Sequence, residues 1–123
     1  MTGLQPSDFA TLLFYVCMGF MATHELDAIQ RREWRLLFLG APLDDETAFH
    51  LFTVLHVPLF AWIIWAASSP TFQTGFSLFA VIHAGVHWVV RRHPRNELNN
   101  PFSWFLIGGA ALCGAAYLWM VTF

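Results

Sequence analysis

Two histidines, His83 and His87, stand four residues apart in an apolar stretch, so on a helix their imidazoles share one face. This is the spacing with which a single helix chelates a metal ion. His24 and Asp27 stand three residues apart in another apolar stretch and also share a face. Imidazole nitrogens and carboxylate oxygens are ligands that suit zinc or iron. The pattern predicts a metal site with the ligands His24, Asp27, His56, His83 and His87.

The acidic residues beside His24 have a second interpretation, as catalytic groups. Glu25 or Asp27 would act as a general base on a water bound to the metal, whose pKa zinc lowers to about 7. The site would then belong to a metal-dependent enzyme that acts on a lipid or another apolar substrate.

Two alternatives need no such enzyme. In the first, His56 and His83 are cofactor-binding residues, the axial ligands of a haem or a chlorophyll-type pigment held between two helices. In the second, the histidines hydrogen-bond between helices and the chain is an accessory subunit of a larger membrane complex.

All these residues lie in four apolar segments of about 20 residues, the length that crosses a bilayer. The expected spans are residues 8–28, 47–67, 72–92 and 101–122. Only 11% of the residues are charged, against about 25% in soluble domains. We therefore expect an all-α fold, a single domain over residues 1–123 that forms a polytopic membrane four-helix bundle with up-down topology. Ionisable groups at similar depth in three such helices indicate one joint site, because each is costly by itself.

Charge also predicts the orientation of this bundle. The six arginines lie in two connections, after the first and the third span. An up-down bundle places both connections on one side, and the positive-inside rule makes that side cytoplasmic, with both termini outside. The site would then occupy the cytoplasmic half of the bundle. Residues 29–39 mix charged and large apolar side chains, which predicts that the first helix continues along the membrane interface.

Several strings of the sequence carry a resemblance to a known family. They are THELDA at residues 23–28, EWR at 33–35, HVPL at 56–59 and HAGVHW at 83–88. Together they resemble a family of small bacterial four-helix membrane proteins of unknown function. The resemblance covers most of the chain and implies the same fold and a bacterial inner (plasma) membrane location, but no established activity.

Two further similarities concern chemistry alone. Membrane metal hydrolases of the ceramidase and adiponectin-receptor group also carry His and Asp on several helices, although they have seven helices. Membrane fatty-acid hydroxylases use histidine clusters, but their HxxHH motif is absent from this sequence.

The composition also limits the partners. The chain has no basic patch interleaved with exposed aromatic residues, so nucleic acid is not an expected partner. Membrane lipids are expected partners. The last span is rich in glycine and alanine between residues 108 and 116, which permits close helix approach within the bundle, in a homo-oligomer or in a larger complex.

Overall fold

The computed structural model describes residues 5–123, and in this part of the chain it contains five α-helices and no strand. The prediction of an all-α fold is confirmed. Residues 1–4, which the expected domain includes, lie outside the described residues. The helices are α1 (Pro6–Gln30), α2 (Trp34–Leu37), α3 (Asp45–Ala66), α4 (Pro70–Val90) and α5 (Pro101–Thr122).

The starts of the last three helices are encoded locally. Asp44 and Asn100 accept hydrogen bonds from backbone N–H groups three residues further on, at 2.8 and 2.9 Å, and Ser69 does the same at 3.4 Å. Such side chains satisfy N–H groups that have no partner within the helix. Pro70 and Pro101 occupy the first helical position, where a missing N–H costs nothing. Because the boundaries depend on these short-range bonds, the observed helices start close to the expected spans.

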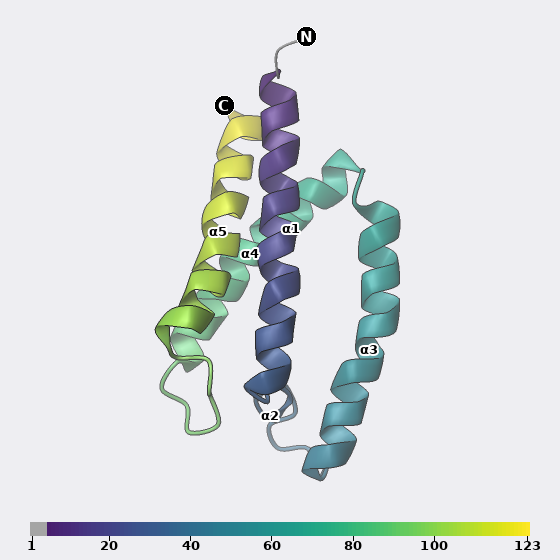
Figure 1. The fold of residues 1–123 in the computed structure, drawn as a ribbon, viewed down its shortest axis with the longest axis vertical. Helices are drawn as coiled ribbons and strands as arrows, with labels where there is room; N and C mark the ends of the chain where they lie inside the picture. Colours follow the sequence, from purple (N-terminus) through teal and green to yellow (C-terminus); the bar gives the residue numbers. More distant parts are fainter. Residues whose placement is uncertain (1–4) are drawn as a thin grey trace.

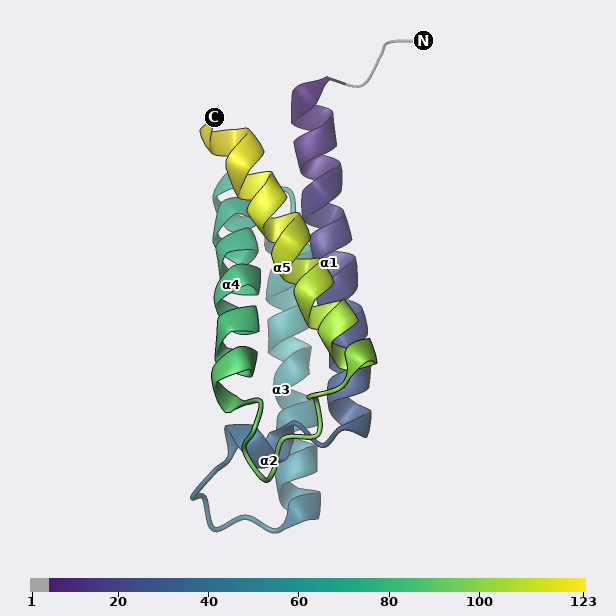
Figure 2. The ribbon, with the colours of Figure 1, turned by 90° about the vertical axis from the view of Figure 1, so that its left-hand side faces the viewer.

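Helix α5 packs against both α1 and α4, whereas α1 and α4 contact each other only over a short stretch (Figures 1 and 2). Cys17 of α1, Ala80 of α4 and Ala110 of α5 meet in one buried cluster. At Gly114, an added Cβ would lie 2.7 Å from the carbonyl oxygen of Ser77, so α4 and α5 approach more closely there than a side chain allows. Gly114 of α5 therefore serves packing within the chain.

Helix α3 stands to one side of these three helices (Figure 1). Within α3 the buried residues are Ala48 and Phe52, both near its start, where they pack with Ala28 and Trp34. Further along α3 most side chains are exposed, and Trp65 is 82% exposed. Large apolar side chains on such a surface are expected where a helix faces lipid rather than water.

Three helices are long and apolar enough to cross a membrane, namely Ser7–Gln30 in α1, α3 and α5. This finding supports a membrane protein. Helix α4 has a similar length, 21 residues, but it is not among the three. Its polar side chains, which include Gln73, Ser77, His83 and His87, lower its hydropathy.

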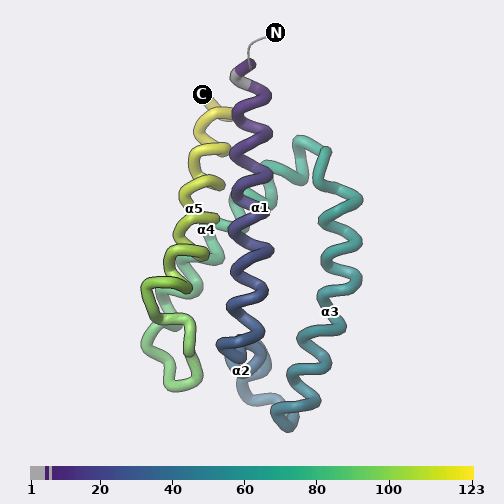
Figure 3. Tube along the Cα trace, in the orientation of Figure 1, coloured from purple at the N-terminus to yellow at the C-terminus, as the bar shows by residue number. Residues whose placement is uncertain are grey.

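The structure corrects the expectation that the first helix continues through residues 29–39. Helix α1 ends at Gln30, and the extension is a separate short helix, α2. Between them Arg32 adopts a left-handed conformation with φ 55°, and the Glu33 N–H donates to the carbonyl of Ala28 at 3.0 Å. This conformation costs a non-glycine residue about 1–3 kcal/mol, so surrounding contacts must hold it. The chain therefore turns sharply after α1 (Figure 3).

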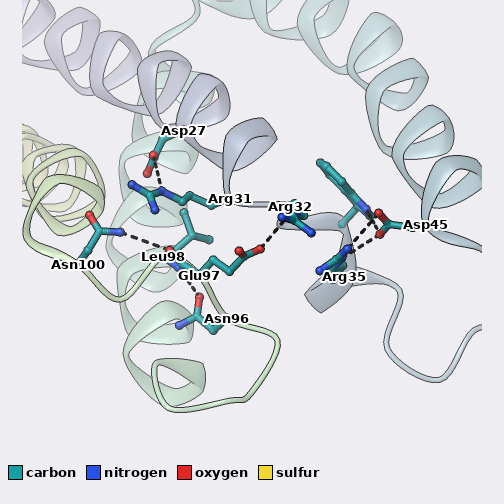
Figure 4. Close-up of polar contacts among 10 residues, drawn as sticks. Asp27, Arg31, Arg32, Arg35, Asp45, Asn96, Glu97, Leu98 and Asn100 are labelled. Atoms are coloured by element: carbon teal, nitrogen blue, oxygen red, sulfur yellow. Dashed lines mark hydrogen bonds and ion pairs between the residues drawn. The ribbon is translucent and has the colours of Figure 1, made fainter.

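Figure 4 draws the contacts around this turn, which lie at the end of the molecule where Figure 1 shows α2. Asp45, the first residue of α3, accepts hydrogen bonds from the indole of Trp34 at 2.9 Å and from Arg35 at 2.9 and 3.1 Å. Hydrogen bonding to Asp45 raises the pKa of the Arg35 guanidinium. Arg32 lies 3.7 Å from Glu97 of the α4–α5 connection. Helix α2 is thus attached to both neighbouring segments, which fixes the residue just before it, Glu33.

A candidate metal centre

Four side chains converge inside the molecule: His24, Glu33, His83 and His87. Each offers one ligand atom, and these four atoms lie within 4.8 Å of one another. They come from three elements, since His24 is on α1, Glu33 is in the turn before α2, and the other two are on α4. The i,i+4 spacing on α4 places His83 and His87 on one helical turn, as the sequence predicts.

The shortest separations between ligand atoms suit a small metal ion. Nε2 of His87 lies 3.1 Å from Nε2 of His83 and 3.2 Å from Oε1 of Glu33. Nε2 of His24 lies 3.6 Å from Oε2 of Glu33. A tetrahedral ion with bonds of about 2.0–2.1 Å separates its ligands by about 3.3–3.4 Å. The observed separations are within a few tenths of an ångström of that value.

Burial of these four side chains costs folding free energy unless their polar atoms have hydrogen-bond or metal partners. His24 is fully buried, and the exposed fractions of His87 and Glu33 are 4% and 8%. Neither nitrogen of His24, nor Nδ1 of His83 or His87, has a hydrogen-bond partner among the described residues. An unsatisfied buried polar atom costs about 1–3 kcal/mol. A divalent cation among the Nε2 atoms would give Nε2 of His24 a partner and relieve the crowding of the imidazoles, so the ligand set fits such an ion.

Glu33 is suited to be the anionic ligand. Burial raises the pKa of its carboxyl group, but the hydrogen bond with His87 and the charges of the neighbouring imidazoles outweigh this effect. The net result is a pKa below the ordinary carboxyl value. Glu33 is therefore a carboxylate at neutral pH, which is the form that binds a metal ion.

Of the five metal ligands expected from the sequence, the structure brings together His24, His83 and His87. Asp27 lies outside this group. Its Oδ2 accepts a hydrogen bond from Ser103 of α5 at 2.5 Å, and its Oδ1 lies 3.5 Å from Arg31 (Figure 4). The carboxylate of Asp27 thus connects α1 to the start of α5.

His56 also lies outside the four-residue group and pairs with Glu25. Its Nδ1 lies 2.7 Å from the carbonyl oxygen of Phe52, and its Nε2 lies 2.6 Å from Oε2 of Glu25. A carbonyl oxygen only accepts hydrogen bonds, so Nδ1 must carry a hydrogen. The short contact between Nε2 and Glu25 therefore holds one proton, on either the imidazole or the carboxyl group.

This arrangement bears on the haem alternative, which assigns His56 and His83 as axial ligands. Nε2 of His56 faces Glu25, and Nε2 of His83 faces His87. The two nitrogens thus face different side chains, and no hydrogen bond joins His56 to His83 within the described residues. Glu25, expected as a catalytic base, is placed beside His56.

Sequence reasoning missed Glu33 as a ligand. Glu33 follows His24 by nine residues. On a continuous helix this separation would put Glu33 on the face opposite His24, because each residue turns the helix by about 100°. No glycine or proline between residues 28 and 33 marks the turn that reverses this relation. A local signal existed only in the mixed character of residues 31–35, where charged residues interrupt the apolar pattern.

Comparison with known protein families gives a match. The model of a family described as "Family of unknown function (DUF6713)" matches residues 10–123. No curated protein and no solved structure matches the chain. The expected resemblance to a family without a known function is confirmed.

Proposed function

We propose that this chain, which belongs to that family of unknown function, is a four-helix transmembrane protein with a zinc or iron centre that serves hydrolysis of a lipid or other apolar substrate. One observation carries the proposal. Three imidazoles and a carboxylate from three elements point their ligand atoms at one buried place. In a bundle with so few charged groups, such convergence has a large cost that a bound cation removes.

The ligand set bears on which metal binds. Four protein ligands complete a tetrahedral zinc site, whereas they leave two positions open on a six-coordinate iron ion. The observed separations of 3.1, 3.2 and 3.6 Å favour the tetrahedral arrangement. With zinc, a substrate oxygen would bind by replacing one of the four ligands, because a catalytic zinc site keeps one position for the substrate.

The Glu25–His56 pair supplies the proton chemistry in this proposal. A bound metal ion would polarise the substrate carbonyl and lower the pKa of water. Glu25 would take a proton from the attacking water and return it to the alcohol that leaves, while its partner His56 keeps the proton already present in their contact. Glu25 follows His24 directly on α1, so the pair and the proposed centre start from neighbouring backbone positions.

Membrane orientation follows from the arginines. Their two connections lie at the same end of the molecule as α2, and the positive-inside rule makes that end cytoplasmic. In this proposal α4 also crosses the membrane, since its polar side chains face the other helices, where Gln73, Ser77 and His87 are buried. The metal centre then lies in the cytoplasmic half.

Metal content tests the proposal. Protein purified in mild detergent should contain about one zinc or iron ion per chain, and His87→Ala should lose it. The matched control is His93→Ala, because His93 lies in the exposed α4–α5 connection and its Nδ1 accepts only from the Arg95 N–H. Protein that takes up neither metal, even after reconstitution, would refute the centre, as would equal metal content in the two variants.

Catalysis is tested separately, with a para-nitrophenyl acyl ester as the probe. Metal-loaded protein should hydrolyse it, and removal of the metal by a chelator should abolish the activity. Glu25→Gln should retain the metal and lose at least about 100-fold in rate, the size of a general-base contribution. Unchanged hydrolysis in this variant would exclude Glu25 as the base.

A further inference from the structure

A groove of about 860 Å³ lies between α1, α3 and α4. Its walls come from residues 18–25 of α1, 59–66 of α3 and 69–79 of the segment that leads into α4. The lining is almost wholly apolar and aromatic. The polar residues described in it lie at its two ends, with Glu25 at one end and Ser69 and Thr71 at the other.

The dimensions of the groove limit what can occupy it. At 1.5 Å per residue, the stretches of α1 and α4 that line it are about 10 and 12 Å long. The connection from α3 to α4, residues 67–69, crosses one end. A transmembrane helix from a second copy needs about 30 Å of apolar length and cannot end inside such a space. A flexible hydrocarbon chain can end there, and the volume lies in the range of about 300–1,000 Å³ usual for small-molecule sites.

The other end of the groove meets the polar groups of the site. Glu25 lines it there and holds His56 at 2.6 Å. Phe79 lines it from α4, and its ring centroid lies 5.5 Å from that of His83. The groove therefore leads from an apolar, lipid-facing region to the neighbourhood of the four-residue group. Its lining matches a single-chain amphiphile, because it is apolar along its length and carries its one described ionisable residue, Glu25, at the end near the site.

The lining of the groove selects among amphiphiles. No arginine, lysine or histidine is among the described residues that line it, so nothing in the groove pairs with a carboxylate or phosphate head. A neutral head with hydroxyl and ester groups needs no such partner and can hydrogen-bond to Glu25. We infer that the groove between α1, α3 and α4 binds one hydrocarbon chain of a neutral single-chain lipid, a monoacylglycerol, with its ester end beside Glu25. As the substrate class of the centre, this assignment rests on the proposed function, whereas the binding itself can be measured without it.

Two substitutions fill the groove without disturbing the packing. Gly75 of α4 lines the groove, and a Cβ added there meets no atom within 4 Å. Gly75→Leu therefore places a side chain in the open space, and leucine favours a helix more than glycine does. Ala22→Leu fills the same groove from α1. Gly108→Leu is the matched control, because a Cβ at Gly108 also meets no atom within 4 Å and this residue does not line the groove.

The experiment adds 1-palmitoylglycerol to detergent-solubilised protein and measures bound lipid by native mass spectrometry. We expect one lipid per wild-type chain, at least tenfold weaker binding to Gly75→Leu and Ala22→Leu, and unchanged binding to Gly108→Leu. Palmitic acid, tested in parallel, should bind more weakly than 1-palmitoylglycerol. Equal binding to all variants, tighter binding of palmitic acid, or a lipid-free dimer held through this face would overturn the inference.

Metal analysis of the same samples separates this inference from the proposed function. Gly75→Leu should keep its metal, which also shows that the variant is folded. His87→Ala should lose the metal and still bind 1-palmitoylglycerol. If the wild-type protein bound the lipid but no metal, the lipid site would be supported and the metal centre refuted. If it bound the metal but no lipid, the metal centre would be supported and the lipid site refuted.

Discussion

Replacing Glu33 by glutamine should release the metal ion, whereas replacing Asp27 by asparagine should not. The two residues are carboxylates near His24, and the spacing in the sequence favours Asp27 as the ligand. The structure instead places the oxygens of Glu33 at 3.2 Å from Nε2 of His87 and at 3.6 Å from Nε2 of His24. Both substitutions keep the shape of the side chain and remove its charge, so the comparison isolates the position of the carboxylate.

The magnitude follows from the role of each carboxylate. Removing a partner that only orients a metal ligand costs about 10–100-fold in affinity, so removing the anionic ligand should cost at least about 100-fold, or about 2.8 kcal/mol. Asp27 is bonded to Ser103 at 2.5 Å and lies beside Arg31. Asp27→Asn should therefore act only through its charge, with a loss of less than about tenfold.

The assay is a competition between the detergent-solubilised protein and a fluorescent zinc chelator, with circular dichroism to verify that each variant keeps its helices. Glu97→Gln serves as a charge control, because Glu97 is exposed and pairs with Arg32 outside the four-residue group. If Asp27→Asn lost the metal and Glu33→Gln kept it, the ligand set derived from the structure would be wrong.

Three other outcomes are expected. Metal affinity should fall as the pH is lowered, because protons compete with the metal for the imidazole nitrogens and the carboxylate; a chelator titration that gives equal affinity at pH 8 and pH 3 would contradict this ligand set. Ser103→Ala should lower stability by about 1–3 kcal/mol in thermal unfolding, since it leaves a buried oxygen of Asp27 without its donor. Gly114→Ala should lower the thermal midpoint, because the added Cβ would lie 2.7 Å from the Ser77 carbonyl oxygen; Gly108→Ala, with open space at its Cβ, should not, and equal midpoints would refute the close contact of α4 and α5.

Local rules in the sequence predicted the long helices well. The expected spans 8–28, 47–67, 72–92 and 101–122 compare with helices at 6–30, 45–66, 70–90 and 101–122. Their boundaries depend on caps such as Asp44 and Asn100, whose partners lie three residues away. Helical periodicity likewise predicted that His83 and His87 act together. Such features need no knowledge of the fold, because every interacting group lies within one turn of its partner.

The fourth ligand of the site was decided by the tertiary structure. The turn at Arg32 depends on contacts with Asp45 and Glu97, which are distant in the sequence, and without that turn Glu33 would face away from His24. The separate position of α3, which opens the groove beside Glu25, likewise depends on how whole helices pack. By itself the sequence determined which segments are helices and which of their faces are polar. Only the tertiary structure decided which polar groups meet. Glu33 reaches His24 because contacts between distant segments outweigh the local conformational cost of the turn at Arg32.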